Sequence, residues 1–172
     1  RLPSWVNRGC SDSNTLDQQA TLEAGRKLML SALAGNNIIH DLGYLDSGMT
    51  SSLELLVICN EMVSQIRRFL QGIPVTPETL AMDTIAAIGP GNHYLTHRQT
   101  KAHYREQIWR PELISRKRYD AWEAEGELTL RQRARAKLLN ILETHEPQPL
   151  PAEVLREMDV LLETAGAARK AS

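Results

Sequence analysis

The sequence predicts a helix-rich α/β protein whose first part alternates strands with helices and whose second part is helical. Two short apolar runs, near residues 5–9 and 37–39, each precede polar residues and a helix with apolar positions near the 3.6-residue period. Helices between successive short strands are typical of a parallel βα arrangement. No convincing strand follows residue 72. We therefore expect two domains, residues 1–72 and residues 73–172.

The first part is expected to begin with a strand at Trp5–Gly9 and a helix from about residue 16 to residue 34. Asn14, Thr15 or Asp17 can cap that helix, and Gly35 ends it. A short buried strand at residues 37–39, a loop at 44–48 and a long helix at 50–70 follow. The expected apolar positions are Leu22, Ala24, Leu28, Leu30 and Leu33 in the first helix and Leu53, Leu56, Val57, Met62, Ile66 and Phe69 in the second.

The second part is expected to contain only helices. Pro77 and Glu78 mark the start of a helix that runs to Ile88, where Gly89-Pro-Gly breaks it. Short helices are expected near 97–107 and 115–125, and a charged helix near 129–143. A proline-rich linker at 147–151 then leads to a last helix at 152–164.

Composition excludes several classes of protein. The 172 residues carry a net charge of −1, so no global field draws the chain to nucleic acid or to an acidic membrane. No apolar run approaches the roughly 20 residues that a membrane-spanning helix needs. The two cysteines form no disulfide framework and fit a reducing compartment, so we expect a cytoplasmic protein.

Polar residues follow both predicted strands, at the ends where parallel βα proteins place their chemistry. Cys10-Ser-Asp-Ser follows the first strand, and His40-Asp follows the second. An anionic pocket for a cation is one interpretation, with Tyr44 as a cation–π face. In the other, Asp12 and Ser13 only cap a helix, and His40-Asp is a hydrogen-bonded loop pair. The carboxylates of the expected pocket are Asp12, Asp41, Asp46 and Glu54.

The two cysteines allow two further interpretations. Cys59 is expected to be a small buried residue of the second helix rather than a nucleophile. Cys10 and His40 could form a hydrolase pair, but no oxyanion-hole motif supports it.

The window from Gly89 to Trp122 gathers histidine and aromatic residues in a chain that is only 5% aromatic. His93 and His97 are four residues apart, as two metal ligands on one helix can be, but the preceding Gly89-Pro-Gly and the lack of a nearby cysteine argue against a metal site. From Arg98 to Arg118 there are seven Lys or Arg and two Glu. This basic stretch can be an ordinary surface, a single-strand nucleic-acid surface or a face for an acidic protein. We favour the first interpretation.

An ordered series of segments resembles the C-terminal third of the trimethylamine:corrinoid methyltransferase family, from about Ser4 to Leu162. The departures are Asn92 and Gln99, where the family pattern has Gly and His. Arg116, Tyr119 and Trp122 follow at the family's spacing. The matching segments are Cys10-Ser-Asp-Ser, His40-Asp-Leu-Gly-Tyr-Leu-Asp-Ser-Gly, Ser52-Leu-Glu-Leu-Leu-Val-Ile, Gly89-Pro-Gly-Asn-His-Tyr-Leu-Thr-His with Thr100, His103-Tyr-Arg and Trp109-Arg-Pro.

The resemblance implies a (β/α)8 TIM barrel, of which residues 1–72 would be the last strand–helix units and residues 73–172 a helical C-terminal extension. The family transfers a methyl group from a methylated amine to the Co(I) corrinoid (cobalamin) of a separate corrinoid protein. Trimethylamine members carry pyrrolysine. This chain has only standard residues, which favours the branch that uses quaternary amines such as glycine betaine.

On this interpretation, the residues at the strand ends and in the window from Gly89 take the following roles. Asp12, His40 and Asp41 are the expected catalytic residues, and no metal ligands are expected. Cys10, Ser11, Ser13, Tyr44, Asp46 and Glu54 would bind the substrate. His93, His97 and Trp109 would meet the corrinoid protein.

Several expectations concern the behaviour of the chain. It should hold no corrinoid tightly, be inactive alone, bind neither nucleic acid nor membrane, and form a homo-oligomer through open strand edges. The alternative function is a non-catalytic helical interaction module that binds an acidic protein partner.

Overall fold

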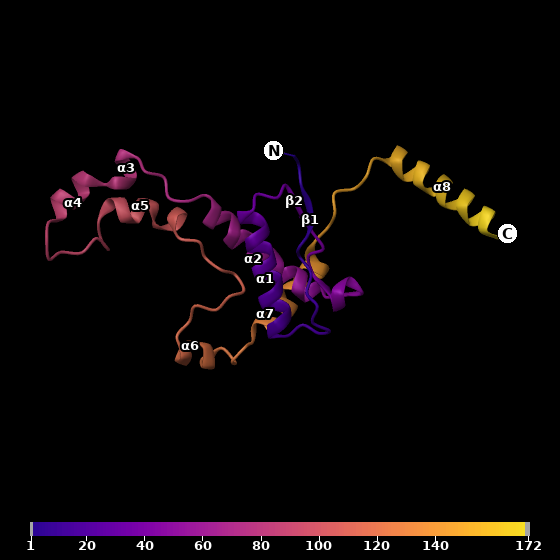
Figure 1. The fold of residues 1–172 in the computed structure, drawn as a ribbon, viewed down its shortest axis with the longest axis horizontal. Helices are drawn as coiled ribbons and strands as arrows, with labels where there is room; N and C mark the ends of the chain where they lie inside the picture. Colours follow the sequence, from indigo (N-terminus) through magenta and orange to yellow (C-terminus); the bar gives the residue numbers. More distant parts are fainter. Residues whose placement is uncertain (1, 171–172) are drawn as a thin grey trace. The chain divides into compact units, whose positions relative to one another are not determined.

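The computed structural model describes residues 2–170, and the side chains of residues 2–166 (Figure 1). Its internal contacts divide the chain into two units, residues 1–140 and residues 141–172. The predicted domain boundary at residue 72 stays a prediction. The fold is helix-rich with little strand, in agreement with the sequence.

Two parallel strands open the first unit. β1 (Trp5–Asn7) pairs with β2 (Ile38–His40), and α1 (Gln18–Leu33) connects them. Trp5 lies opposite Ile38, and Asn7 lies opposite His40. The pair has no third strand among the described residues, so each strand keeps one open edge. The predicted βα arrangement is therefore confirmed for this part of the chain.

The segment expected to be a loop at 44–48 contains a small hairpin instead. β3 (Tyr44–Leu45) pairs antiparallel with β4 (Thr50–Ser51), and the 3-10 turn η1 (Asp46–Gly48) joins them. The turn needs a left-handed backbone, with φ of 50° at Asp46, 53° at Ser47 and 95° at Gly48. Aspartate, serine and glycine are polar or small, so the sequence of this hairpin resembles that of a loop.

α1 and α2 (Leu53–Leu70) pack against each other to form the core. Asp17 caps α1 by accepting from the Ala20 N–H at 2.9 Å, and Ser52 caps α2 by accepting from the Leu55 N–H at 3.1 Å. Cys59 is fully buried, as predicted. The apolar residues that the two helices bury are Ala20, Ala24, Leu28, Leu55, Val57, Ile58, Cys59 and Ile66.

Six of the apolar positions that the sequence places on the two helices are exposed. The buried stripe of α1 runs through Ala20, Ala24 and Leu28, because small side chains let a second helix approach closely. Several larger apolar residues therefore lie on the other faces of the two helices. The exposed positions are Leu22, Leu30, Leu33, Leu53, Leu56 and Phe69.

Helices follow in the second half, as predicted: α3 (Pro77–Leu80), α4 (Met82–Ile88), α5 (Arg98–Gln107), α6 (Tyr119–Ala124), α7 (Leu130–Thr144) and α8 (Ala152–Lys170). No strand follows β4 in the part of the chain that the structure describes. The helix expected from 76 to 88 is two helices, because Ala81 adopts a left-handed φ of 53°. Within residues 2–170, no helix is both long enough and apolar enough to cross a bilayer.

A buried carboxylate fixes the segment that precedes α6. Glu61 of α2 is 6% exposed and accepts from the backbone N–H groups of Glu112, Leu113 and Ile114 at 3.0, 2.7 and 2.7 Å. Arg133 of α7 donates through Nε to the Leu113 carbonyl at 2.6 Å. The backbone at Leu113 is therefore held from both sides, and its side chain joins the core.

Candidate functional site

The loops that follow β1 and β2 lie against each other. We call residues 10–13 and 41–47 the strand-end loops. Ser11 donates its backbone N–H to the Tyr44 carbonyl at 3.0 Å, and Asp46 donates to the Ser13 carbonyl at 2.9 Å. Ser47 donates to the Ser11 carbonyl at 3.3 Å. The structure thus brings together the two polar segments that the sequence places after separate strands.

A close backbone approach makes this arrangement possible. Gly9 donates to the His40 carbonyl at 2.9 Å, just beyond the β1–β2 ladder. A Cβ atom at residue 9 would lie 2.5 Å from the Leu42 nitrogen and 2.6 Å from its Cα. Only glycine fits there, so Gly9 allows the two loops to meet.

Asp12 and Asp46 present carboxylates that form no ion pair with a cation among the described residues. Asp12 accepts from the Ser47 hydroxyl at 3.0 Å, and Asp46 accepts from the Asn14 amide at 2.9 Å. None of the ion pairs among the described residues includes either carboxylate. Neutral donors orient both groups without removing their charge, which leaves negative potential at this end of the strands.

Glu23 of α1 belongs to the same network, although the sequence analysis missed it. Its Oε2 accepts from the Ser11 hydroxyl at 2.8 Å and from the Asp12 N–H at 2.9 Å, and its Oε1 accepts from Gln19 at 2.9 Å. Lys27 lies 3.9 Å away and donates to the Cys10 carbonyl at 3.1 Å. The Asp12 hydrogen bond, then those from Gln19 and Ser11 and the charge of Lys27, lower the pKa of Glu23 to about 2.

One signal in the sequence could have found this residue. Glu23 and Lys27 are four residues apart on the helix that directly follows the polar segment, so they share one helical face. That face can turn toward the loop that precedes the helix.

His40 and Asp41 form the hydrogen-bonded pair that one of the two interpretations expects. His40 Nδ1 lies 2.7 Å from Asp41 Oδ1, and both side chains are about one-third exposed. Trp5 of β1 meets the imidazole edge to face, with ring centres 5.3 Å apart. The Cys10 thiol donates to the Asn7 side chain at 3.1 Å. The catalytic roles expected for Asp12, His40 and Asp41 stay predictions.

Glu54 differs from the other expected members of the anionic pocket. It lies in the first turn of α2 and pairs with Arg135 of α7 at 3.0 Å. Its own backbone N–H and the hydrogen bonds from Arg135 and Ser52 lower its pKa. Glu54 is therefore ionised, and Arg135 compensates its charge. The other expected substrate-binding residues, exposed Tyr44 and buried Ser11 and Ser13, belong to the strand-end loops.

The expected partner-contact residues have separate surroundings. His93 is exposed in the turn before α5, and His97 caps α5 by accepting from the Gln99 N–H at 3.3 Å. Trp109 donates its indole N–H to Ser64 of α2 at 3.0 Å. Among the described residues, no group of His, Cys, Asp or Glu is arranged to hold a metal ion.

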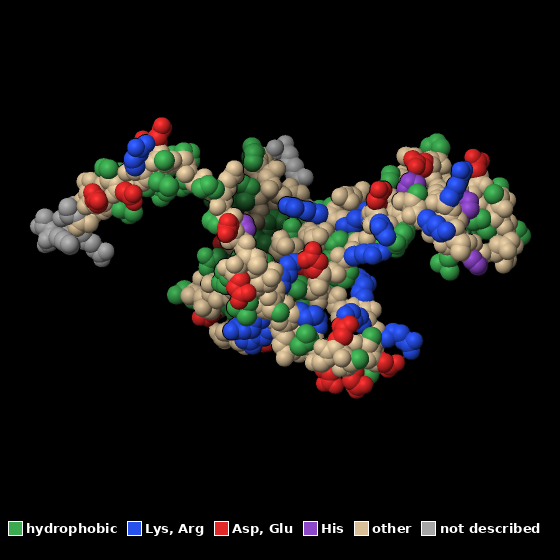
Figure 2. Space-filling model, turned by 180° about the vertical axis from the view of Figure 1, so that it is seen from behind, with side chains coloured by type: hydrophobic (Ala, Val, Ile, Leu, Met, Phe, Trp, Pro, Cys, Tyr) green, Lys and Arg blue, Asp and Glu red, His purple; other side chains and the backbone are tan. Residues whose placement is uncertain are grey.

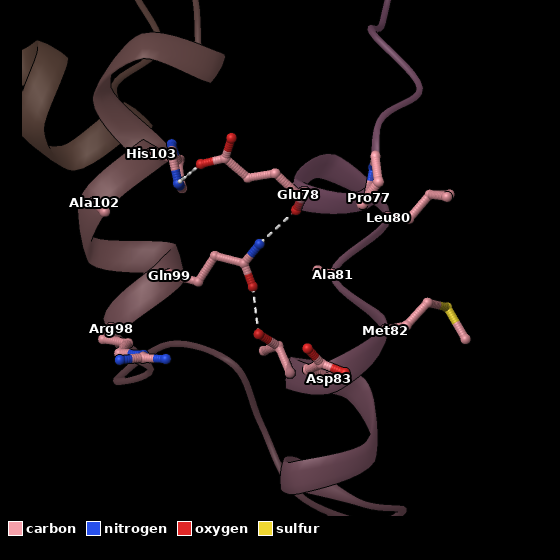
Figure 3. Close-up of a pocket in the computed structure, with 11 residues that line it drawn as sticks. Pro77, Glu78, Leu80, Ala81, Met82, Asp83, Arg98, Gln99, Ala102 and His103 are labelled. Atoms are coloured by element: carbon pink, nitrogen blue, oxygen red, sulfur yellow. Dashed lines mark hydrogen bonds and ion pairs between the residues drawn. The ribbon is translucent and has the colours of Figure 1, made fainter.

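Gln99, one of the departures from the family pattern, lies in a cleft of about 660 Å³ between α3–α4 and α5 (Figure 3). Its amide donates to the Glu78 carbonyl at 2.8 Å, and its side-chain oxygen accepts from Thr84. His103, one turn further along α5, reaches the Glu78 carboxylate at 3.3 Å. These contacts tie α5 to α3 and α4, so the cleft is where the helical segments are joined.

Basic side chains are exposed along α5 and the segment after it. Tyr104 has the guanidinium groups of Arg105 and Arg110 within 5.7 and 5.5 Å of its ring centre, and Arg116 lies 6.0 Å from that of Trp109. In Figure 2, Lys and Arg side chains are exposed over this part of the molecule, among Asp, Glu and His side chains. We call this the basic face. It consists of Arg98, Lys101, Arg105, Arg110, Arg116 and Arg118, none of which pairs with a carboxylate among the described residues.

Parallel strands that lead into polar loops define a class of α/β proteins whose ligand sites lie at the carboxyl ends of the strands. Within that class, residues 1–168 match the model of the family described as trimethylamine methyltransferase (MTTB). The chain belongs to this family, which confirms the resemblance found in the sequence.

Curated relatives agree with this family assignment. The chain is 39% identical to trimethylamine methyltransferase MttB2 of Methanosarcina mazei, over 98% of this chain and 34% of that protein. It is 36% identical to MttB of Desulfitobacterium hafniense (strain DCB-2), over 94% of this chain and 32% of the relative. It is 31% identical to a glycine betaine methyltransferase of D. hafniense (strain Y51), over 96% of this chain and 34% of the relative. The chain thus spans about a third of the length of these relatives.

Proposed function

We propose that this chain is the C-terminal third of an enzyme that transfers a methyl group from a methylated tertiary or quaternary amine to the Co(I) corrinoid of a partner protein. Relatives named for trimethylamine and for glycine betaine both match nearly the whole chain, which supports a methylated amine as donor. A (β/α)8 barrel takes about 250 residues. The relatives are long enough for such a barrel, with β1, α1, β2 and α2 as its last units.

The uncompensated carboxylates of Asp12 and Asp46 are the observation that carries this proposal. A quaternary ammonium group has no N–H to donate, so a protein recognises it by negative potential and by aromatic faces. Two carboxylates at the strand ends, and an exposed tyrosine at position 44 of the same loops, supply that chemistry. Protonated trimethylamine would be attracted in the same way.

The residues of this chain need only bind and aim the substrate. The methyl acceptor, the Co(I) corrinoid, is a second substrate that the partner brings, and it supplies the nucleophile. A quaternary amine leaves as a neutral tertiary amine, so the chain needs no general acid. Fixing one methyl group in line with the acceptor lowers the barrier through proximity and electrostatic preorganisation. We assign this role to Asp12, Asp46 and Tyr44, with His40–Asp41 orienting a carboxylate or meeting the acceptor.

The basic face supports a protein partner and a second candidate function. If the full-length protein has no methyltransferase activity, this face favours a module that binds an acidic protein. Nucleic acid is the weaker alternative, because stacking requires open aromatic faces, and arginine side chains already lie over Tyr104 and Trp109.

The test uses the full-length protein with a reduced corrinoid protein and four donors: trimethylamine, glycine betaine, proline betaine and carnitine. Mass spectrometry of the demethylated amine should detect turnover of at least one donor. Asp12→Asn and Asp46→Asn should each raise the KM for that donor about tenfold or more, because a charged contact is lost. Asp83→Asn, on the exposed surface of α4, is the matched control and should have no effect. Absence of demethylation of all four donors would overturn the proposal.

A further inference from the structure

We infer that Glu23 is a positioning residue that sets the orientation of Asp12 and thereby the affinity for the methylated amine. This inference rests on the proposed function, because it deepens the account of the same site. Glu23 lies on α1, the helix that follows residues 10–13 of the strand-end loops, and it reaches those residues only through its side chain.

One oxygen of Glu23 holds two groups of the loop at once. Oε2 accepts from the Asp12 backbone N–H and from the hydroxyl of Ser11, whose residue is fully buried. The Ser11 hydroxyl oxygen in turn accepts from the Ser13 N–H at 3.0 Å. Three consecutive residues are thus fixed by one carboxylate, so the direction of the Asp12 side chain depends on a group that does not touch the substrate.

Lys27 completes the support from the same helix face. It donates to the Cys10 carbonyl at 3.1 Å while lying 3.9 Å from Glu23 Oε2. The carboxylate therefore holds loop N–H groups and the ammonium holds a loop carbonyl. The opposed charges of Glu23 and Lys27 also explain why this support adds little net potential to the site, so the potential there comes from Asp12 and Asp46.

A network built in this way is independent of what covers the open side of the strand-end loops. Every partner of Glu23 lies within residues 11–27, in a single βα unit. The full-length protein should retain the same contacts, and the experiment can be done with it.

The variants Glu23→Ala and Glu23→Gln separate the positioning role of the Glu23 side chain from the effect of its negative charge. Alanine removes the acceptor for Ser11 and Asp12, so the amine kcat/KM should fall about tenfold or more, mainly through KM. Glutamine keeps one oxygen that can accept from both donors, so its loss should be smaller. The KM for the corrinoid protein should stay unchanged in both variants. Gln18→Ala, at an exposed position of the same helix, is the control and should behave as the unmodified enzyme.

A double-mutant cycle tests whether Glu23 acts through Asp12. In the Asp12→Ala background, Glu23→Ala should reduce the amine kcat/KM less than about threefold, because no oriented carboxylate remains to be lost. Additive losses, or equal losses in KM for the amine and for the corrinoid protein, would show a general structural role and overturn the inference. If the unmodified enzyme demethylates no amine, the proposed function fails instead, so the two failures are distinguishable.

Discussion

Replacement of Glu61 should release the segment before α6 from the core. Its carboxylate is 6% exposed and accepts three backbone N–H groups, of which the one from Leu113 is buried. In Glu61→Ala that donor loses its partner inside the protein, and the other two turn to water. A buried unpaired donor costs about 1–3 kcal/mol, and each hydrogen bond to a charged group contributes about 1.5–3 kcal/mol.

Because two of the three donors regain water, we expect the free energy of unfolding to fall by about 3–5 kcal/mol in Glu61→Ala. Glu61→Gln keeps one acceptor oxygen and should lose about half as much. Urea unfolding followed by tryptophan fluorescence measures both, since Trp109 and Trp122 flank the segment. Glu112→Gln removes an exposed carboxylate that pairs with Lys137, and as the matched control it should cost at most about 1 kcal/mol.

Proteolysis gives a local measurement of the same effect. Arg116, Lys117 and Arg118 are exposed trypsin sites directly after the anchored segment. Their cleavage should accelerate in Glu61→Ala and not in the Glu112→Gln control. A loss below about 1 kcal/mol in Glu61→Ala, with unchanged cleavage, would refute the claim that this carboxylate anchors the segment.

Three further predictions follow from the first unit. Burial raises the pKa of the Cys59 thiol to about 11, so in the native protein at pH 8 a thiol reagent should modify the half-buried Cys10 first and Cys59 only on unfolding. Gly9→Ala would place a Cβ atom 2.5 Å from the Leu42 backbone nitrogen, so the urea midpoint should fall, with a loss of at least about 2 kcal/mol. The pKa of Glu23 is about 2 in the folded protein and 4.5 in an unperturbed glutamate, so its contribution to stability is complete above pH 4.5. That contribution should disappear between pH 4.5 and 2, and Glu23→Gln should flatten the pH dependence of the unfolding free energy in that range.

The sequence predicted the order of helices and the parallel strand pair because both depend on local signals. Asp17 is a good cap, Gly35 a good stop, and adjacent isoleucines at 38 and 39 favour a strand. The break at Ala81 was not predictable, because alanine favours a continuous helix and only the surrounding contacts impose a left-handed φ. The apolar period marked the large leucines of the first helix, whereas its buried stripe runs mainly through small residues such as Ala20 and Ala24.

Only part of the candidate site was predictable, because only some of its residues are marked by local sequence signals. Asp12 follows the first predicted strand and Asp46 lies in the loop predicted after the second, so their residue types and positions indicated a site. Glu23 lies inside a helix pattern, where a glutamate normally faces solvent, and its role arises only when the loop folds back onto α1. Likewise, pairing of Glu54 with Arg135 joins residues 81 positions apart, which no local pattern reveals.

The open edge of β2 has a consequence for how the proposed barrel is completed during synthesis. No strand follows β4 in the described part of the chain, and β2 is paired on one side only, by β1. In a closed eight-stranded barrel, the last strand must pair with the first. In the proposed barrel, the open edge of residues 38–40 would have to pair with a strand from another part of the enzyme before the sheet could close into a cylinder. Until that moment the growing chain would expose unpaired edges, the state in which chaperones are most needed.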